Sequence, residues 1–188
     1  MAIGPSTQRM THAVQPTEIP PDALLQACRA AGTYTDCYVC EVPGQVSHAA
    51  FVEAFYTSPL FKLERGLLHW LARQPATDAD ARLLAEGAAE RFSAWRVEAR
   101  SPDQLLLADF TGRTRSWLMV ASAGDVDEPS GTRLYFGSAV VPKRPHGAEN
   151  AGKDAGRMGF VFHALLGFHR LYSRLLLGSA RARVLSLR

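Results

Sequence analysis

Residues 158–180, MGFVFHALLGFHRLYSRLLLGSA, are the longest stretch of the chain with helical spacing. Projected at about 100° per residue, the stretch has a basic stripe and an opposite apolar arc. The basic stripe lies within about 20° of His163 and contains Arg170, Arg174 and Arg181. The members of the apolar arc are Val161, Leu165, Phe168, Tyr172, Leu175 and Leu176. Because an apolar helix face must be buried against another layer, the stretch predicts a long helix that closes a sheet.

The segment before this helix is typical of consecutive strands. Residues 95–99, 105–110, 114–121 and 132–141 are rich in strand-forming types, and short turn-like segments such as Pro129-Ser130-Gly131 join them. Short connections favour an antiparallel meander. An earlier strand is predicted at 33–42, with helices between Asp22 and Gly32, from Ser47 onward, at 58–71 and at 78–92. The pattern predicts an α+β fold, an antiparallel sheet wrapped around the long C-terminal helix.

The length of 188 residues is typical of one domain. Residues 1–20 lack periodicity and predict a flexible N-terminal arm, and residues 21–182 are expected to form the single domain. Residues 183–188 are expected to be a basic tail, and residues 142–157 a polar loop.

Composition excludes several classes of protein. A net charge of +3, from 21 basic and 18 acidic residues, is too balanced for a nucleic-acid-binding surface. We expect neither a secretory signal nor a transmembrane segment, and therefore a cytoplasmic protein, because no apolar stretch has the required length. Cys37 and Cys40 should point to opposite faces of one strand, so we predict no disulfide between them, no metal site and no cofactor.

His169 is the first candidate for a functional role. It projects at about 240° from His163, just inside the margin of the apolar arc, and should point toward the sheet or a cavity. A histidine in such a place can act as a general acid or base. The alternative, which we favour, is a core histidine whose ring nitrogens are satisfied by a backbone carbonyl or a tyrosine.

Two further groups are candidates for ligand binding. Arg115 and Trp117 share one strand face and, with Asp109 from the preceding strand, could hold a carboxylate or carbonyl group. A cross-strand ion pair is the favoured alternative for Arg115. Glu64 lies within an apolar helix face, where a carboxylate is either at the rim or paired with an arginine.

Three segments carry a family resemblance: Tyr34-Thr35-Asp36-Cys37-Tyr38-Val39, Gly131-Thr132-Arg133-Leu134-Tyr135-Phe136-Gly137-Ser138 and Phe168-His169-Arg170. Across roughly residues 20 to 182 the chain resembles a bacterial domain of unknown function in the START and polyketide-cyclase-like superfamily, which also occurs behind NAD-binding epimerase-like domains. Gly167 departs from that pattern, which has a proline before the Phe-His pair. The resemblance implies a helix-grip fold with an apolar ligand cavity, and it implies no catalytic residues.

These observations lead to three functional hypotheses. The first is a module that binds a small apolar or amphipathic molecule between the sheet and Phe162, Leu165, His169 and Tyr172. The second is an acid-base enzyme of the cyclase or hydratase type, with His169 oriented by Asp109 or Glu64. The third is a surface for an acidic protein or an anionic membrane, formed by the arginine stripe. Binding is favoured over catalysis because no motif specifies a reaction.

Overall fold

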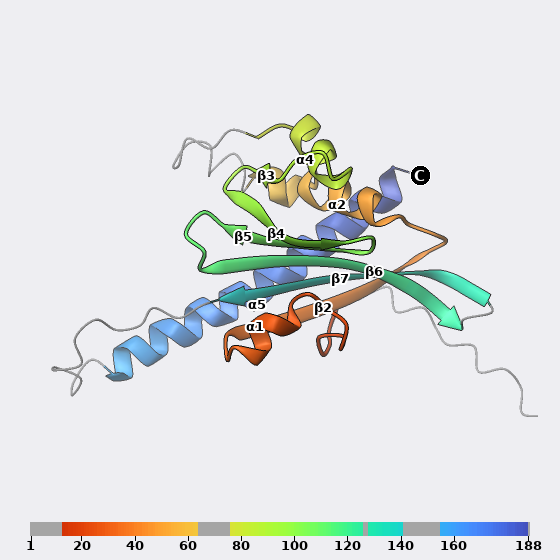
Figure 1. Ribbon diagram of the computed structural model, residues 1–188. Coiled ribbons are helices and arrows are strands. Elements are labelled where there is room, and N and C mark those ends of the chain that lie inside the picture. The colour runs from red at the N-terminus through yellow and green to blue at the C-terminus, as the bar shows by residue number, and fades with distance from the viewer. Residues whose placement is uncertain (1–12, 64–75, 126–127, 141–154, 188) are drawn as a thin grey trace, which may run out of the picture.

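The computed structural model describes residues 13–63, 76–125, 128–140 and 155–187, with the side chains of 125, 128–130 and 155–168 excepted (Figure 1). Within these residues, one antiparallel sheet has the strand order β1-β2-β7-β6-β5-β4-β3. Its strands are β1 (Gln15–Pro16), β2 (Tyr34–Pro43), β3 (Arg91–Phe92), β4 (Trp95–Ser101), β5 (Gln104–Asp109), β6 (Thr114–Asp125) and β7 (Glu128–Val140). The helices are α1 (Gln26–Ala30), α2 (His48–Tyr56), α4 (Asp78–Ala85) and α5 (Ala155–Ser186).

The helices lie on both sides of the sheet. The long helix α5 crosses one face, where it contacts β2, β7 and α2, and α4 packs on α2 (Figure 1). The short helix α1 contacts β2 and covers the other face. The α+β class, the antiparallel sheet and the C-terminal helix are therefore confirmed. No helix among the described residues has an apolar run long enough to cross a membrane.

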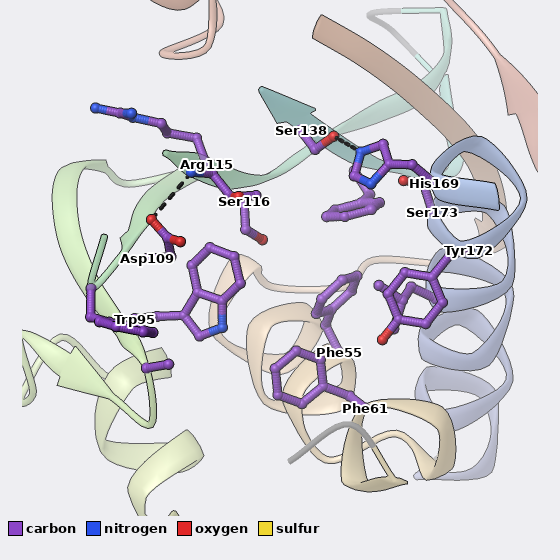
Figure 2. Close-up of a pocket in the computed structure, with 15 residues that line it drawn as sticks. Phe55, Phe61, Trp95, Asp109, Arg115, Ser116, Ser138, His169, Tyr172 and Ser173 are labelled. Atoms are coloured by element: carbon purple, nitrogen blue, oxygen red, sulfur yellow. Dashed lines mark hydrogen bonds between the residues drawn. The ribbon is translucent and has the colours of Figure 1, made fainter. Parts of the chain in front are cut away.

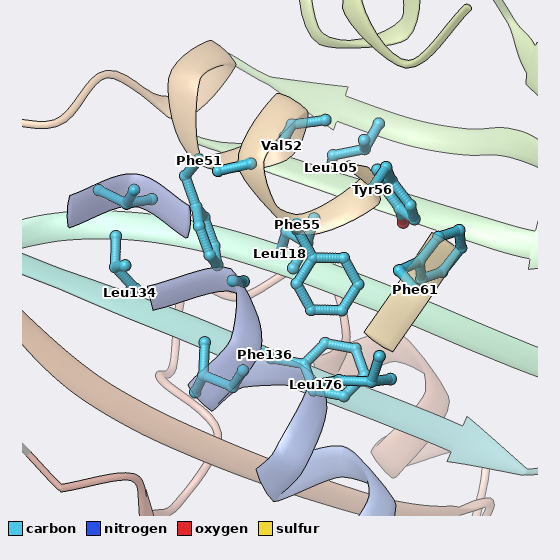
Figure 3. Packing of buried hydrophobic residues seen from close by; sticks show 14 of the residues in the cluster. Phe51, Val52, Phe55, Tyr56, Phe61, Leu105, Leu118, Leu134, Phe136 and Leu176 are labelled. Atoms are coloured by element: carbon cyan, nitrogen blue, oxygen red, sulfur yellow. The ribbon is translucent and has the colours of Figure 1, made fainter. Parts of the chain in front are cut away.

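An aromatic cluster fills the space between the sheet, α2 and α5 (Figure 3). Phe55 is at its centre, with its ring centroid 4.9 Å from that of Phe136 on β7 and 5.1 Å from that of Tyr56. Phe51 and Phe61 also contact the Phe55 ring, and all five side chains are buried. Edge-to-face and tilted arrangements of this kind contribute beyond simple burial of area. This cluster is the principal core of the protein.

A second apolar layer lies on the face of the sheet that α1 covers. Trp117 is fully buried there against Leu25, and its indole Nε1 donates to Gln104 Oε1 at 3.0 Å. The same Gln104 oxygen accepts from the Leu24 N–H. Gly137 permits this packing, because an added Cβ would lie 2.7 Å from Leu25 Cδ2 and 2.9 Å from Trp117 Cε3. Any larger residue at this position would require the outer layer to shift.

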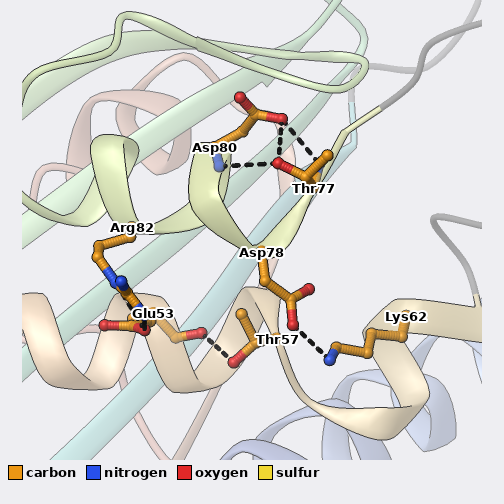
Figure 4. Close-up of polar contacts among 7 residues, drawn as sticks. All are labelled: Glu53, Thr57, Lys62, Thr77, Asp78, Asp80 and Arg82. Carbon is orange, nitrogen blue, oxygen red and sulfur yellow. Dashed lines mark hydrogen bonds and ion pairs between the residues drawn. The ribbon is translucent and has the colours of Figure 1, made fainter.

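Polar contacts fix α4 on α2 (Figure 4). The Thr77 side chain accepts from the Asp80 N–H, while the Asp80 carboxylate accepts from the Thr77 N–H, which forms a capping box at the start of α4. Arg82 on α4 donates to Glu53 on α2 at 3.2 Å. The start of α2 also follows expectation, because the Ser47 side chain accepts from the Ala50 N–H.

Two expected elements in the middle of the chain are present, but one boundary of each is wrong. The helix predicted over 78–92 ends at Ala85, because Gly87 has a φ of 79° and the N–H groups of Ala88 and Ala89 turn back to the Leu83 carbonyl. Residues 91–92 are strand β3 instead. Residues 129–131, expected as a turn, lie inside β7, which a register shift at Gly124 of β6 accommodates.

The terminal segments also differ from expectation. The predicted N-terminal arm contains β1, which pairs with Val39 and Tyr38 of β2, and Ile19 is buried. Helix α5 continues through Ser186 with Val184 buried, so residues 183–186 are helical rather than a tail. Residues 64–71 of the predicted helix and residues 142–154 of the predicted loop lie outside the described residues.

Candidate functional site

His169 lies on the buried face of α5. From Ser173 onward the buried residues of this helix project at about 220° to 320° from His163, rather than around the expected arc near about 170°. These residues are Ser173, Leu176, Leu177, Ala180 and Val184. Leu175, expected to be buried, is 52% exposed. The expected phase of the helix is therefore wrong, and His169 at about 240° lies within the range of the buried residues, with its side chain 26% exposed.

The arginine stripe of α5 runs along β2. The Arg170 guanidinium lies 5.9 Å from the Tyr34 ring centroid, and its Nε donates to the Tyr34 hydroxyl at 3.0 Å. Arg174 lies 5.5 Å from the Tyr38 ring centroid. Such contacts between cations and aromatic rings hold the helix against the strand. The stripe is thus a contact between α5 and β2, although Arg170 and Arg174 remain exposed.

Asp36, Ser138 and His169 form a hydrogen-bonded chain between β2, β7 and α5. Asp36 and Ser138 are directly opposite each other in the antiparallel pair of β2 and β7. The Ser138 hydroxyl lies 2.6 Å from Asp36 Oδ1 and 2.6 Å from His169 Nε2. The Ser138 N–H also donates to Asp36 Oδ1, at 3.2 Å, and Asp36 Oδ2 lies 3.8 Å from His169 Nε2. The register of β2 and β7 therefore aligns Asp36 with Ser138, and α5 brings His169 to Ser138.

The number of protons available to Asp36, Ser138 and His169 determines the direction of each hydrogen bond among them. A carboxylate only accepts, so the single hydroxyl proton of Ser138 is donated to Asp36. The hydrogen bond between Ser138 Oγ and His169 Nε2 must then use a proton on Nε2. In a neutral imidazole, Nδ1 is consequently an acceptor. Ser138 is not prepared as a nucleophile, because its proton is directed to Asp36 rather than to His169.

The charge of Asp36 acts on its surroundings. Burial, together with the nearby Asp36 carboxylate, raises the pKa of Tyr38 to about 12. Asp36 itself has a side chain only 8% exposed, and its Oδ2 has no hydrogen-bond partner among the described residues. A buried carboxylate oxygen of this kind favours positive charge or hydrogen-bond donors nearby.

A pocket of about 290 Å³ opens beside His169, between the sheet, α2 and α5 (Figure 2). Six of its fifteen described lining residues are phenylalanine, tryptophan or tyrosine, and His169, Ser138 and Ser173 form one polar end. Its lining comprises Phe55, Phe61, Ala94, Trp95, Asp109, Phe110, Thr114, Arg115, Ser116, Phe136, Ser138, His169, Tyr172, Ser173 and Leu176. The volume is at the lower end of the ~300–1,000 Å³ typical of small-molecule sites.

Trp95 is the second polar feature of the pocket. Its indole extends toward Phe55 in the middle of the cavity (Figure 2). The Nε1 atom is buried and has no hydrogen-bond partner among the described residues. A buried donor without an acceptor is unfavourable by about 1–3 kcal/mol. In contrast, Ser116 is already engaged, 3.3 Å from the Tyr56 hydroxyl.

The structure does not bring Arg115, Trp117 and Asp109 together as a ligand clamp. The Arg115 guanidinium donates to Glu98 of β4 at 3.0 Å, which is the ion pair favoured as the alternative. The expected alternation along β6 is correct, and it places Trp117 on the α1 side of the sheet. Asp109 accepts from the backbone N–H groups of Arg113 and Thr114 and thereby closes the turn between β5 and β6.

Some of the remaining residues expected at the site lie within the described part of the structure, and others do not. Tyr172 lines the pocket with His169. Glu64 lies outside the described residues, and so do the side chains of Phe162 and Leu165. Cys37 and Cys40 belong to the two opposite apolar layers, as the strand alternation predicted. Burial raises the pKa of both thiols to about 12.

Sequence reasoning missed Asp36, Ser138 and Trp95 as parts of the site. Asp36 and Ser138 both lie in segments that the sequence predicts as strands, 33–42 and 132–141. Their pairing depends on the register between β2 and β7, which the sequence pattern does not define. Trp95 enters the site through a tight turn from β3, where Ser93 has a φ of 52°.

Comparison of the chain with known protein-family models, curated protein sequences and solved structures yields no match. The geometry of the pocket and of its polar end is therefore the basis on which we infer a function.

Proposed function

We propose that this protein binds a small apolar or amphipathic molecule in the pocket between its sheet and α5. The observation that carries the proposal is the combination of a mostly apolar cavity of about 290 Å³ with the His169 imidazole in its lining and the unpartnered Trp95 indole N–H. Solvent-accessible cavities with mostly apolar walls and few polar groups are typical of ligand sites. A core that served only for stability would leave neither the volume nor the Trp95 donor unfilled.

The arrangement of the elements supports a finer proposal about the fold. A sheet whose inner face holds a long C-terminal helix, with a cavity between them, is the architecture implied by the resemblance to START and polyketide-cyclase-like domains. Helix α5 contacts β2 and β7 on one side of the pocket, while β4, β5 and β6 form the other. We therefore extend the proposal to a helix-grip fold whose ligand lies between the helix and the sheet.

A dye titration tests the binding proposal. Phenylnaphthylamine is uncharged and fluoresces strongly only in apolar surroundings, and we expect saturable binding to the wild-type protein. Replacing Ser173 by methionine extends a side chain into the pocket and should weaken binding at least about tenfold, a loss of roughly 1.4 kcal/mol. Ala182→Met adds the same side chain at an exposed position of α5 and should bind the dye as wild type does.

Equal binding by wild type and Ser173→Met would overturn the proposed location of the site. Absence of saturable binding in wild type would count against a ligand-binding function of this pocket. Urea unfolding of both variants verifies that each is folded before the titrations are compared.

The chain of Asp36, Ser138 and His169 favours acid-base catalysis as a second candidate function. Nδ1 of a neutral His169 can take a proton from a bound molecule, and the Asp36 carboxylate would stabilise the resulting imidazolium. Asp36 thus takes the orienting role first assigned to Asp109 or Glu64. Deuterium exchange at the acidic carbon of β-tetralone, followed by NMR, is expected to be faster with wild type than with His169→Gln. Equal rates would exclude this role for His169.

A further inference from the structure

Two carboxylates flank the pocket, one at each end. At the α5 end, Asp36 lies behind Ser138 and His169 and keeps a buried oxygen without a partner among the described residues. At the opposite end, Asp109 lines the pocket, with its carboxylate held by the Arg113 N–H and the Thr111 hydroxyl. An anionic ligand would be repelled most strongly at the α5 end, because the Asp36 side chain there is only 8% exposed and apolar walls exclude water.

No arginine or lysine among the described lining residues directs its charged group into the pocket. Arg115 is the one such residue in the lining, and Figure 2 shows its side chain directed away from the aromatic interior. Its guanidinium is committed to Glu98 and to the Gly112 carbonyl. Within the described residues, the pocket therefore lacks the bidentate cation that typically holds a carboxylate ligand.

The pocket offers a hydrogen-bond acceptor at His169 and a hydrogen-bond donor at Trp95. The proton on His169 Nε2 is given to Ser138, which leaves Nδ1 of the neutral ring with a lone pair that can accept a hydrogen bond. The Trp95 indole N–H is only a donor, and it is buried and unpartnered there. A complementary ligand must donate a hydrogen bond at the His169 end and accept one at Trp95.

Resting on the binding function proposed above, we infer that the pocket takes an uncharged aromatic molecule of one or two rings that bears a hydroxyl or N–H donor for His169 Nδ1 and an acceptor for Trp95 Nε1. A carboxylate of the same shape is rejected. The aromatic side chains of Phe55, Phe61 and Phe136 provide the surface on which such rings pack. The hydrogen-bonded chain of Asp36, Ser138 and His169 sets this preference for an uncharged ligand over a carboxylate. Asp36 determines both the local charge and the tautomer of the His169 imidazole.

Three ligands of matched shape test the inference by competition with phenylnaphthylamine at about pH 7, where a free carboxylic acid is ionised and a phenol is not. They are a methoxynaphthol, the corresponding dimethoxynaphthalene and the corresponding methoxynaphthoate. All three offer the methoxy oxygen to Trp95 and differ only in the group that meets His169. We expect the naphthol to bind at least about tenfold more tightly than the naphthoate, with the dimethoxy compound between them.

Charge variants identify the group responsible for the rejection. Asp36→Asn should narrow the difference between naphthol and naphthoate, because it removes the buried charge and keeps the side-chain shape. Glu53→Gln changes the net charge equally on the outer side of α2 and should leave the difference unchanged. The comparison among ligands in the wild-type protein stands without the variants, so a misfolded Asp36→Asn protein would not prevent the test.

The outcomes separate the two proposals. If the naphthoate binds as tightly as the naphthol, the ligand class is wrong while the binding function stands. If naphthol and dimethoxynaphthalene bind equally, no donor is recognised at His169, and the inference fails at that point. If neither the three ligands nor the dye bind, the proposed function itself is overturned.

Discussion

Replacing Phe55 by alanine should lower the free energy of unfolding by about 3–5 kcal/mol, the range for removing a phenylalanine from a packed core. Phe55 is 1% exposed, and its ring contacts four other aromatic rings. The neighbouring elements α2, α5 and β7 are held in place by other contacts, so the cavity left by the ring cannot collapse completely. Urea unfolding followed by circular dichroism measures the change.

Phe110→Ala is the matched control for this substitution. Phe110 also lies at the pocket, but it is 69% exposed, and its replacement should change the free energy of unfolding by less than about 0.5 kcal/mol. A loss below about 1 kcal/mol in Phe55→Ala would contradict the assignment of the aromatic cluster as the principal core.

The second large effect is a dependence of stability on pH that originates at His48. This residue begins α2, is 8% exposed, and its Nε2 has no hydrogen-bond partner among the described residues. Burial, assisted by the Arg100 charge, lowers the pKa of His48 from 6.5 to about 4. Between these two values the unfolded chain binds a proton at His48 that the folded protein does not. His48 therefore removes about 3 kcal/mol of stability as the pH falls from 6.5 to about 4.

Urea unfolding of wild type and His48→Gln at about pH 7 and about pH 4 measures this contribution. Other titrating groups contribute to both proteins, so the comparison isolates His48. We expect the variant to lose about 3 kcal/mol less than wild type on acidification. The same loss in both proteins would show that the folded state protonates His48 as easily as the unfolded chain does.

The sequence predicted the strands of the sheet better than the phase of its closing helix. Alternation and turn residues located β2, β4, β5, β6 and β7 to within a few residues. In α5, leucines occur on every side of the helix, with Leu171 and Leu175 exposed and Leu176 and Leu177 buried. An apolar pattern of this kind does not show which side faces the sheet, and Arg170 and Arg174 add to the ambiguity because they pack on tyrosine rings of β2.

The candidate site was predicted only in part, because some of its residues are brought together by contacts between distant segments of the chain. His169 and Tyr172 were expected at a cavity, and both line it. The group that orients His169 was sought at Asp109 or Glu64, whereas Asp36 is connected to it through Ser138. This connection arises from the pairing of two strands about a hundred residues apart and from the crossing of α5 above them. Neither feature is encoded in a local pattern.

The indole N–H resonance of Trp95 gives the most direct test of a ligand in this pocket. In a heteronuclear NMR titration with the methoxynaphthol, we predict a saturable shift of the Trp95 signal, because its free donor gains an acceptor. Trp117, fully buried on the other face of the sheet and bonded to Gln104, is the internal control and should not shift. The variants Trp95→Phe and Trp117→Phe assign the two signals. An unchanged Trp95 signal at saturating ligand, or equal shifts of Trp95 and Trp117, would contradict binding in the pocket beside His169.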